Sequence, residues 1–400
     1  MTDIFANKTL LNAQSITRRG IKILDHLVAF QTTNDRSNLD LISFVETLFA
    51  PLGARMERAG GTESKTNLIV SVGPNRPGGI VLSGHTDVVP TTGQDWSRDP
   101  FKMWQDGGRL YGRGTTDMKG FVAMAIATAE AAAHENLTLP LHLALSYDEE
   151  IGCIGVPPMA ARLGEPDFAP SLVVVGEPSL MQVIDGHKGG AVGIFHVRGL
   201  AGHSSLSDRL VNAVSAGAEI TCYLNGLAKA LRNREQNNRF DPPFSTISVN
   251  RLHGGTHGNI VPKSCELLWE MRLLPGQSTE EQLASILAHV AAEIEPWMKA
   301  VEATTGIRHQ LVNFIPALNV NSDKAATALA LLLSQTTVPK AVSYGSEAGF
   351  FQRHKIPAVI CGPGNIAQAH KPDEFVEIMQ LESCGLFMQR LIQHLTKGSK

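Results

Sequence analysis

The stretch Ser83-Gly84-His85-Thr86-Asp87-Val88-Val89-Pro90 indicates an α/β fold with a polar site at a sheet edge. It places a histidine and an aspartate two residues apart, just after the apolar, strand-like run at 80–83. In open α/β sheets, residues just beyond the carboxyl ends of strands face a common crevice. His85 and Asp87 are therefore predicted to face such a crevice.

Further acidic residues and a second histidine share this setting, because each follows an apolar run. They are Asp117 after 109–114, Glu149 and Glu150 after 141–147, Glu177 after 172–176, and His370 after 358–362. Carboxylates gathered in one crevice repel one another unless cations hold them together. The pattern predicts a metal centre with two ions.

The order of helical and strand-like segments predicts a mostly parallel sheet in the first part of the chain. Helices are expected at 15–29, 39–52 and 118–134, and strands at 67–72, 80–83, 139–147 and 172–176. Such a β-α-β-α-β order gives a sheet with helices on both faces. The connection from 85 to 117 is long and rich in Gly, Pro and Trp, and loops of this length are usually functional.

A different pattern begins near residue 187. Strands are expected at 191–198, 244–252, 265–274 and 307–314, with helices at 209–231 and 279–294. This β-α-β-β-α-β order predicts a ferredoxin-like α+β domain at 187–314. Because His370 must join the earlier residues, this domain is predicted to be inserted into a catalytic domain made of 1–186 and 315–400.

Composition excludes several classes of partner. A net charge of −3 gives no basic footprint for nucleic acid or an anionic membrane. The five cysteines are scattered and never form a Cys-x-x-Cys pair, which argues against a disulfide scaffold and favours a reducing compartment. The first five residues lack signal-peptide character and no apolar run approaches about 20 residues, so a cytoplasmic protein is expected.

The predicted metal centre has a ligand set suited to amide hydrolysis. Zinc bound by histidine nitrogen and carboxylate oxygen lowers the pKa of bound water to about 7, and a second ion helps to polarise the substrate carbonyl. His85 and His370 are terminal nitrogen ligands, Asp117 is a candidate bridge, and Glu150 and Glu177 are terminal oxygen ligands. Zinc, cobalt and manganese all suit this set.

Two acids remain for other roles. Glu149, next to Glu150, is free to act as a general base. Asp87 can reach back to the imidazole of His85 and fix its orientation. Taken singly, His85 could be an ordinary core histidine, Glu149 and Glu150 a solvated loop, and Asp117 a helix cap. Those alternatives leave the shared position after strands unexplained.

These residues resemble the zinc metallopeptidase and deacylase family that includes acetylornithine deacetylase, succinyl-diaminopimelate desuccinylase, aminoacylase and glutamate carboxypeptidase. The resemblance covers almost the whole chain. The matching blocks are Gly84-His85-Thr86-Asp87-Val88-Val89-Pro90, Tyr111-Gly112-Arg113-Gly114-Thr115-Thr116-Asp117-Met118-Lys119-Gly120, Asp148-Glu149-Glu150, Gly176-Glu177-Pro178 and Gly202-His203-Ser204-Ser205. Within the family, the segments around 96–101, 187–189, 271–276, 346–348 and 362–374 are most similar to acetylornithine deacetylase.

The resemblance implies a specific assignment of the metal centre. His85 and Glu177 would hold one zinc ion, Glu150 and His370 the other, and Asp117 would bridge them. Glu149 would be the general base and Asp87 the residue that orients His85. Cobalt is a possible substitute for zinc, and the inserted domain would serve as lid and dimer interface.

Substrate contacts are expected outside the metal ligands. Arg272 is a candidate clamp for the substrate carboxylate, or a surface ion pair. Asn259 is a candidate hydrogen-bonding partner, and His203 a candidate oxyanion donor. By resemblance His203 acts in the neighbouring subunit's site, which requires a homodimer. Glu347 would face the amine of an ornithine-like side chain or brace a zinc ligand.

The sequence therefore predicts a zinc-dependent amidohydrolase of small N-acyl amino acids. The expected reaction is removal of acetate from N2-acetyl-L-ornithine, in arginine biosynthesis. Desuccinylation, general aminoacylase activity and dipeptide cleavage are the alternatives within the family. A non-catalytic metal-binding scaffold is the alternative from another class.

Overall fold

The computed structural model describes residues 12–320 and 324–397. Their contacts divide the chain into two compact units, and each is described by itself. The first unit holds the described residues of Met1–Asp185, Val320–Lys340 and Ser346–Lys400, and the second holds Gly186–Asn319 and Ala341–Gly345. The predicted limits of the insertion were 187 and 314. The signal-peptide expectation falls on residues 1–5, outside the described ranges.

The first unit is built on a mixed sheet in the order β1-β2-β6-β3-β7-β14-β8-β13, of which the short strands β8 and β13 include residues that are grouped with the second unit. Its strands are β1 Arg55–Glu57, β2 Leu68–Val72, β3 Ile80–His85, β6 Leu141–Ser146, β7 Leu172–Pro178, β8 Ile184–His187, β13 Lys340–Val342 and β14 Ala358–Gly362. The central strands β6, β3, β7 and β14 pair in parallel, whereas β1, β2 and β8 pair with their neighbours in antiparallel fashion. The mostly parallel sheet predicted from the sequence is confirmed.

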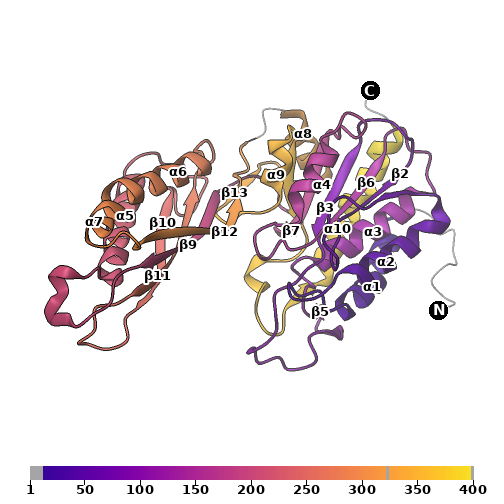
Figure 1. The fold of residues 1–400 in the computed structure, drawn as a ribbon. Helices are drawn as coiled ribbons and strands as arrows, with labels where there is room; N and C mark the ends of the chain where they lie inside the picture. The colour runs from indigo at the N-terminus through magenta and orange to yellow at the C-terminus, as the bar shows by residue number, and fades with distance from the viewer. Residues whose placement is uncertain (1–11, 321–323, 398–400) are drawn as a thin grey trace. The chain divides into compact units, whose positions relative to one another are not determined.

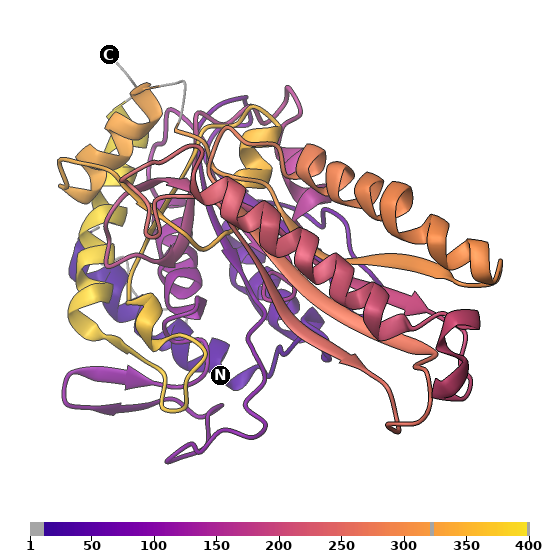
Figure 2. The same cartoon turned by 90° about the vertical axis from the view of Figure 1, so that its left-hand side faces the viewer.

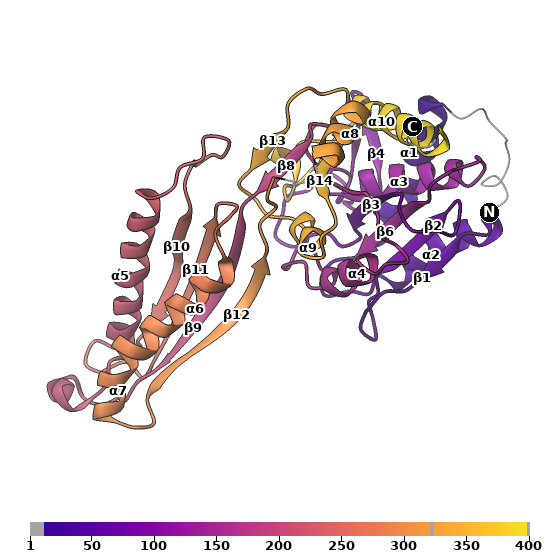
Figure 3. The same cartoon turned by 90° about the horizontal axis from the view of Figure 1, so that it is seen from above.

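Helices cover both faces of this sheet, as the views in Figures 1 and 3 show. On one face α1 (Ala13–Ala29), α3 (Lys119–Ala132) and α10 (Ile378–Lys397) pack against one another. On the other face α4 (Val156–Leu163) packs against α9 (Ala348–Arg353). Helix α2 (Leu39–Phe49) contacts α3, and α8 (Lys324–Ser334) contacts α10 and β14.

Helix α3 packs closely on the sheet, against β3, β6 and β7. The helix is rich in Ala, Met and Ile and is buried over nearly its whole length. It lies so near β7 that a Cβ atom added at Gly176 would lie 1.9 Å from Phe121 Cγ. Glycine is required there because no side chain fits between the helix and the strand.

A small second sheet occupies the long connection that the sequence suggested would be a loop. Strands β4 (Trp104–Asp106), β5 (Arg109–Tyr111) and β15 (Phe375–Glu377) pair in the order β15-β5-β4. Trp104, Tyr111 and Phe375 lie opposite one another, with ring centroids 5.1 and 5.4 Å apart. In Figure 2 the purple hairpin of β4 and β5 lies beside the yellow C-terminal segment that carries β15. This sheet joins parts of the chain that are far apart in sequence.

The second unit has the β-α-β-β-α-β order expected for residues 187–314. Strands β9 (Gly189–Arg198), β10 (Thr246–Gly254), β11 (Ser264–Leu273) and β12 (Gly306–Ile315) form an antiparallel sheet in the order β10-β11-β9-β12. Helices α5 (Ala213–Arg232), α6 (Thr279–His289) and α7 (Glu295–Val301) pack against it. Helix α5 begins later than predicted because Asn212 caps it by accepting from the N–H groups of Val214 and Ser215.

Across the described residues, no helix combines the length and apolar character needed to span a lipid bilayer.

Candidate metal centre

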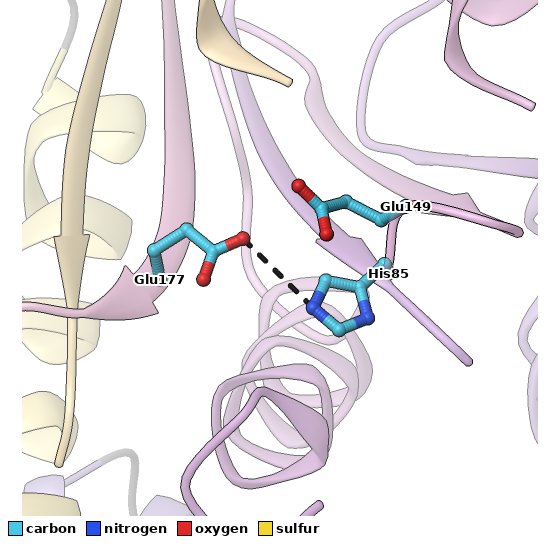
Figure 4. A group of neighbouring side chains, drawn as sticks. All are labelled: His85, Glu149 and Glu177. Carbon is cyan, nitrogen blue, oxygen red and sulfur yellow. Dashed lines mark ion pairs between the residues drawn. The ribbon is translucent and has the colours of Figure 1, made fainter. Parts of the chain in front are cut away.

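His85 lies at the centre of the candidate site. It is the last residue of β3, and its imidazole is buried. Its Nδ1 lies 2.9 Å from the backbone carbonyl oxygen of Asp87. Its Nε2 lies 3.2 Å from Asp117 Oδ1 and 3.8 Å from Glu177 Oε1. Figure 4 shows His85 with Glu177 and Glu149, whose side chains point toward it.

Asp117 lies between the two histidines. While its Oδ1 faces His85, its Oδ2 lies 3.3 Å from His370 Nε2. The same His370 nitrogen lies 3.0 Å from Glu150 Oε2. One carboxylate thus meets two imidazoles through its two oxygen atoms, which is the arrangement that a bridging ligand requires.

Glu149 and Glu150 are presented by a tight turn after β6. Backbone N–H groups of Gly152 and Cys153 donate to the carbonyl oxygen of Glu149, which closes the turn. The carboxylate of Asp87 accepts from the N–H groups of Glu149 (3.2 Å) and Glu150 (3.1 Å). Asp87 therefore fixes His85 with its backbone carbonyl and fixes this turn with its side chain.

Asp117, Glu177 and His370 lie at other places relative to the strands than predicted. Asp117 follows β5 of the small sheet and not a strand of the central sheet. Glu177 lies inside β7, and His370 follows β14 only after the 3₁₀ turn Ile366–Gln368. The prediction that every site residue follows a strand of one sheet is wrong in these respects. The side chains nevertheless converge.

The converging side chains fit metal ions. Two groups have potential ligand atoms all within 4.8 Å of one another: His85 with Glu149 and Glu177, and His85 with Asp117 and Glu150. Glu150 Oε1 is buried and has no hydrogen-bond partner among the described residues. A buried carboxylate oxygen without a partner is costly, and a cation would satisfy it.

Protonation offsets the repulsion among these acids when no cation is present. Burial raises the pKa of Glu149 to about 8 and that of Glu150 to about 7, and raises the pKa of Glu177 well above its usual range. Hydrogen bonds to Asp117 and Glu150 raise the pKa of His370 to about 10. Burial also raises the pKa of Asp117, but hydrogen bonds from His370 and His85 outweigh it and lower that pKa overall.

Glu347 lies in the interior and does not face solvent. It is fully buried at the N-terminus of α9 and accepts from Ser83 Oγ (2.5 Å) and Ser146 Oγ (2.8 Å). Both serines belong to the strands that present His85 and the Glu149 turn. Of the two predicted roles, this geometry favours the brace behind the metal ligands over contact with a substrate amine.

His203 and Asn259 lie together in the second unit, and both are exposed. His203 caps the short helix Ser204–Arg209, with its Nδ1 2.8 Å from Ser205 Oγ. The N–H of Ser204 donates to the carbonyl oxygen of Asn259 at 3.0 Å. The two loops that carry these predicted substrate contacts are therefore neighbours.

Arg272 lies at the other end of β11 from this loop pair. It pairs with Glu270 at 2.5 Å and lines a hollow with Lys188, Gly190 and Asn313. Strand β11 has 10 residues and begins at Ser264, just after the Asn259 loop. At about 3.3 Å per residue, Ser264 and Arg272 are roughly 26 Å apart. A small substrate cannot touch both Arg272 and the His203–Asn259 pair of the same chain.

Two features of the site were not anticipated from the sequence. Cys153 Sγ lies 3.3 Å from Glu149 Oε1 and donates to it, so a buried thiol holds one oxygen of that carboxylate. Glu374 accepts hydrogen bonds from the segment that carries Asp117. The sequence places Cys153 and Glu374 near site residues but gives no sign of these contacts.

The chain is similar to a family of hydrolases over most of its length. Residues 81–394 match the model of Peptidase family M20/M25/M40. An acetylornithine deacetylase from Proteus mirabilis (strain HI4320) is 34% identical over 379 residues, which covers 93% of this chain and 94% of that protein.

Solved structures share the fold. An M20 family metallo-carboxypeptidase from Sulfolobus solfataricus superposes with a TM-score of 0.74 at 18% identity, covering 94% of this chain and 99% of that one. A dinuclear metal binding peptidase from the M20 family of Bacillus subtilis superposes with a TM-score of 0.62 at 16% identity, covering 96% and 99%.

Metal binding should release protons. Near pH 7 the metal-free cluster holds protons on His370 and Glu149 and partly on Glu150, and ligands must lose protons to bind a cation. We expect zinc affinity to rise from pH 6 to pH 8. Calorimetric titrations in two buffers of different ionisation enthalpy measure the release. Equal affinity at both pH values, with no buffer dependence, would contradict this prediction.

Proposed function

The chain belongs to Peptidase family M20/M25/M40, and we propose that this hydrolase removes the acetyl group from N2-acetyl-L-ornithine, a step of arginine biosynthesis. The products are L-ornithine and acetate. The main support for a hydrolytic activity is the position of the Asp117 carboxylate, which lies between His85 and His370 and beside three further acids. The choice of substrate is supported by the 34% identity to an acetylornithine deacetylase.

The proposed metal ligands divide into two sets that share Asp117. His85 and Glu177 would hold one zinc ion, Glu150 and His370 would hold the other, and Asp117 would bridge them, as the short distances among these side chains support. Cobalt is a candidate substitute, since the ligands suit both metals. Bound in this way, the ions would polarise the substrate carbonyl and lower the pKa of a water molecule toward neutrality.

Glu149 is the proposed general base. Its carboxylate lies beside His85, and the Cys153 thiol holds Oε1, which leaves Oε2 for proton transfer. Glu149 takes a proton from the attacking water, which adds to the acetyl carbonyl carbon. Glu149 then gives the proton to the amine nitrogen as the C–N bond breaks. Asp87 is a positioning residue for both His85 and Glu149.

We propose that substrate contacts come from two copies of the chain. Arg272 clamps the substrate carboxylate in its own subunit's site. Its ion pair with Glu270 is partly exposed, so the guanidinium can leave Glu270 and bind the substrate carboxylate instead. His203 donates to the oxyanion, with Asn259 nearby, in the partner subunit's site. The separation of roughly 26 Å along β11 supports this division.

The remaining proposals concern organisation and location. Residues 1–186 and 315–400 form the catalytic domain, and 187–314 form the lid and dimerisation domain. The division of the chain at Gly186 and Asn319 supports these limits. A cytoplasmic location is supported by the five cysteines, none of which forms a disulfide among the described residues.

A panel of substrates tests the function directly. Purified protein with zinc should have a higher kcat/KM for N2-acetyl-L-ornithine than for N-succinyl-diaminopimelate, N-acetylmethionine and a dipeptide. Preference for another member of the panel would reassign the substrate within the family. If no member turns over while zinc binds, the protein is a metal-binding scaffold and the proposed activity is wrong.

Replacing Glu149 should separate catalysis from metal binding. Because the base takes part in each proton transfer, we expect Glu149→Ala to lower kcat about 100- to 10,000-fold. Zinc content, measured by mass spectrometry, should stay near that of the unchanged protein, since the five proposed ligands remain. Near-normal turnover in this variant would rule out Glu149 as the base.

Mixing two inactive variants tests the shared site. Glu149→Ala and His203→Ala chains are mixed and allowed to exchange subunits. In a mixed dimer, one site combines an intact Glu149 with the partner's intact His203. Random exchange should then restore about a quarter of the normal activity. If His203 acts within its own subunit, no activity returns.

A further inference from the structure

A buried carboxylate next to the metal centre has no role in the chemistry above. Glu374 is only 1% exposed and lies in the segment that follows His370. Its Oε2 accepts from Arg113 Nη1 at 2.7 Å and from the N–H of Gly114 at 3.0 Å. Its Oε1 accepts from the N–H groups of Thr116 at 2.9 Å and Asp117 at 3.1 Å. One side chain thus holds the whole turn that ends at Asp117.

The same network reaches the second histidine. Arg113 Nη2 donates to Gln94 Oε1, and Gln94 Nε2 donates to the backbone carbonyl oxygen of His370 at 3.0 Å. Arg113 also lies over the ring of Trp96, whose Nε1 donates to Gln94. The Asp117 turn and the His370 backbone are therefore connected through Glu374, Arg113 and Gln94.

We propose that Glu374 is a positioning residue that fixes the spacing between Asp117 and His370, so that one carboxylate can serve two cations. Glu374 touches neither cation nor substrate and acts through the backbone of Asp117 and, by way of Arg113 and Gln94, that of His370. The inference rests on the proposed metal centre. Glu374 would keep the two halves of that centre at a fixed spacing.

A charged carboxylate is needed for this task. Two oxygen atoms accept from four donors, one of them a guanidinium. Hydrogen bonds to an ionised acceptor are roughly twice as strong as neutral ones. A glutamine of the same shape would turn an NH₂ group toward two of the donors and would free that part of the turn.

Glu377 provides a matched control in the same segment. Glu377, on β15, pairs with Arg109, on β5, at 3.6 Å. Like the Glu374–Arg113 pair, this ion pair joins the C-terminal segment to the segment that leads to Asp117. The side chains of Arg109 and Glu377 are 43% and 47% exposed, whereas those of Arg113 and Glu374 are buried. Exposed ion pairs contribute little. Glu377→Gln should therefore leave the metal centre unchanged.

The experiment titrates metal-free protein with Co²⁺ and follows both visible absorption and calorimetric stoichiometry. We expect Glu374→Gln to weaken binding of at least one of two ions about 10- to 100-fold, as loss of a residue that orients ligands does. Glu377→Gln should bind like the unchanged protein. Thermal melting of the metal-free variants reports their folding. Cobalt affinities of Glu374→Gln within about two-fold of normal would overturn the proposal.

A second variant decides the matter if Glu374→Gln does not fold. Removing one partner of a buried ion pair is strongly destabilising. Gln94 is partly exposed, and Gln94→Ala removes the link to His370 together with the bonds that Gln94 accepts from Arg113 and Trp96, while the four hydrogen bonds to Glu374 remain. We expect weaker cobalt binding from it too, and unchanged binding would overturn the proposed reach to His370. If the unchanged protein binds no cobalt, the metal centre itself fails, which is a separate result.

Discussion

The mutual repulsion of buried acids around His85 is the constraint on which the architecture of the first unit depends. Asp117, Glu149, Glu150 and Glu177 lie close together in a region where burial penalises their ionised forms. Such a cluster persists only because the surrounding backbone holds each acid in place, with protons or cations offsetting the charge. The fold supplies that restraint from several directions.

Each restraint comes from a different part of the chain. Asp87 holds the Glu149 turn through two backbone N–H groups. Glu347, from α9, accepts from a serine on β3 and another on β6, behind the strand ends. Glu374 holds the Asp117 turn from the C-terminal segment. Three further carboxylates thus stabilise the backbone or neighbouring strands. The site therefore contains acids of two kinds: those proposed to bind the cations, and those that keep the first kind in position.

The sequence predicted the first kind and named Asp87 and Glu347 as candidates of the second kind, but it gave Glu374 no role. Apolar runs identify the central strands, and polar residues after them gather at one edge by the geometry of parallel sheets. This geometry is enough to predict that His85 and Glu150 lie close together. The partners of Glu347 and Glu374 lie hundreds of residues away, and no local pattern reports such pairing. Strands β4, β5 and β15 have three residues each, too few for a periodic signal.

The small sheet explains why the two kinds of acid must be considered together. Asp117 follows β5, and Glu374 directly precedes β15, which pairs with β5. The carboxylate that lies between the two histidines does not come from the central sheet, whose strand β3 supplies His85. Bringing Asp117 in from a separate sheet gives its carboxylate an independent approach. The segment that carries Asp117 is not held by the central sheet, so it needs another contact to fix its position. Glu374 supplies one by accepting a hydrogen bond from the N–H of Asp117 itself.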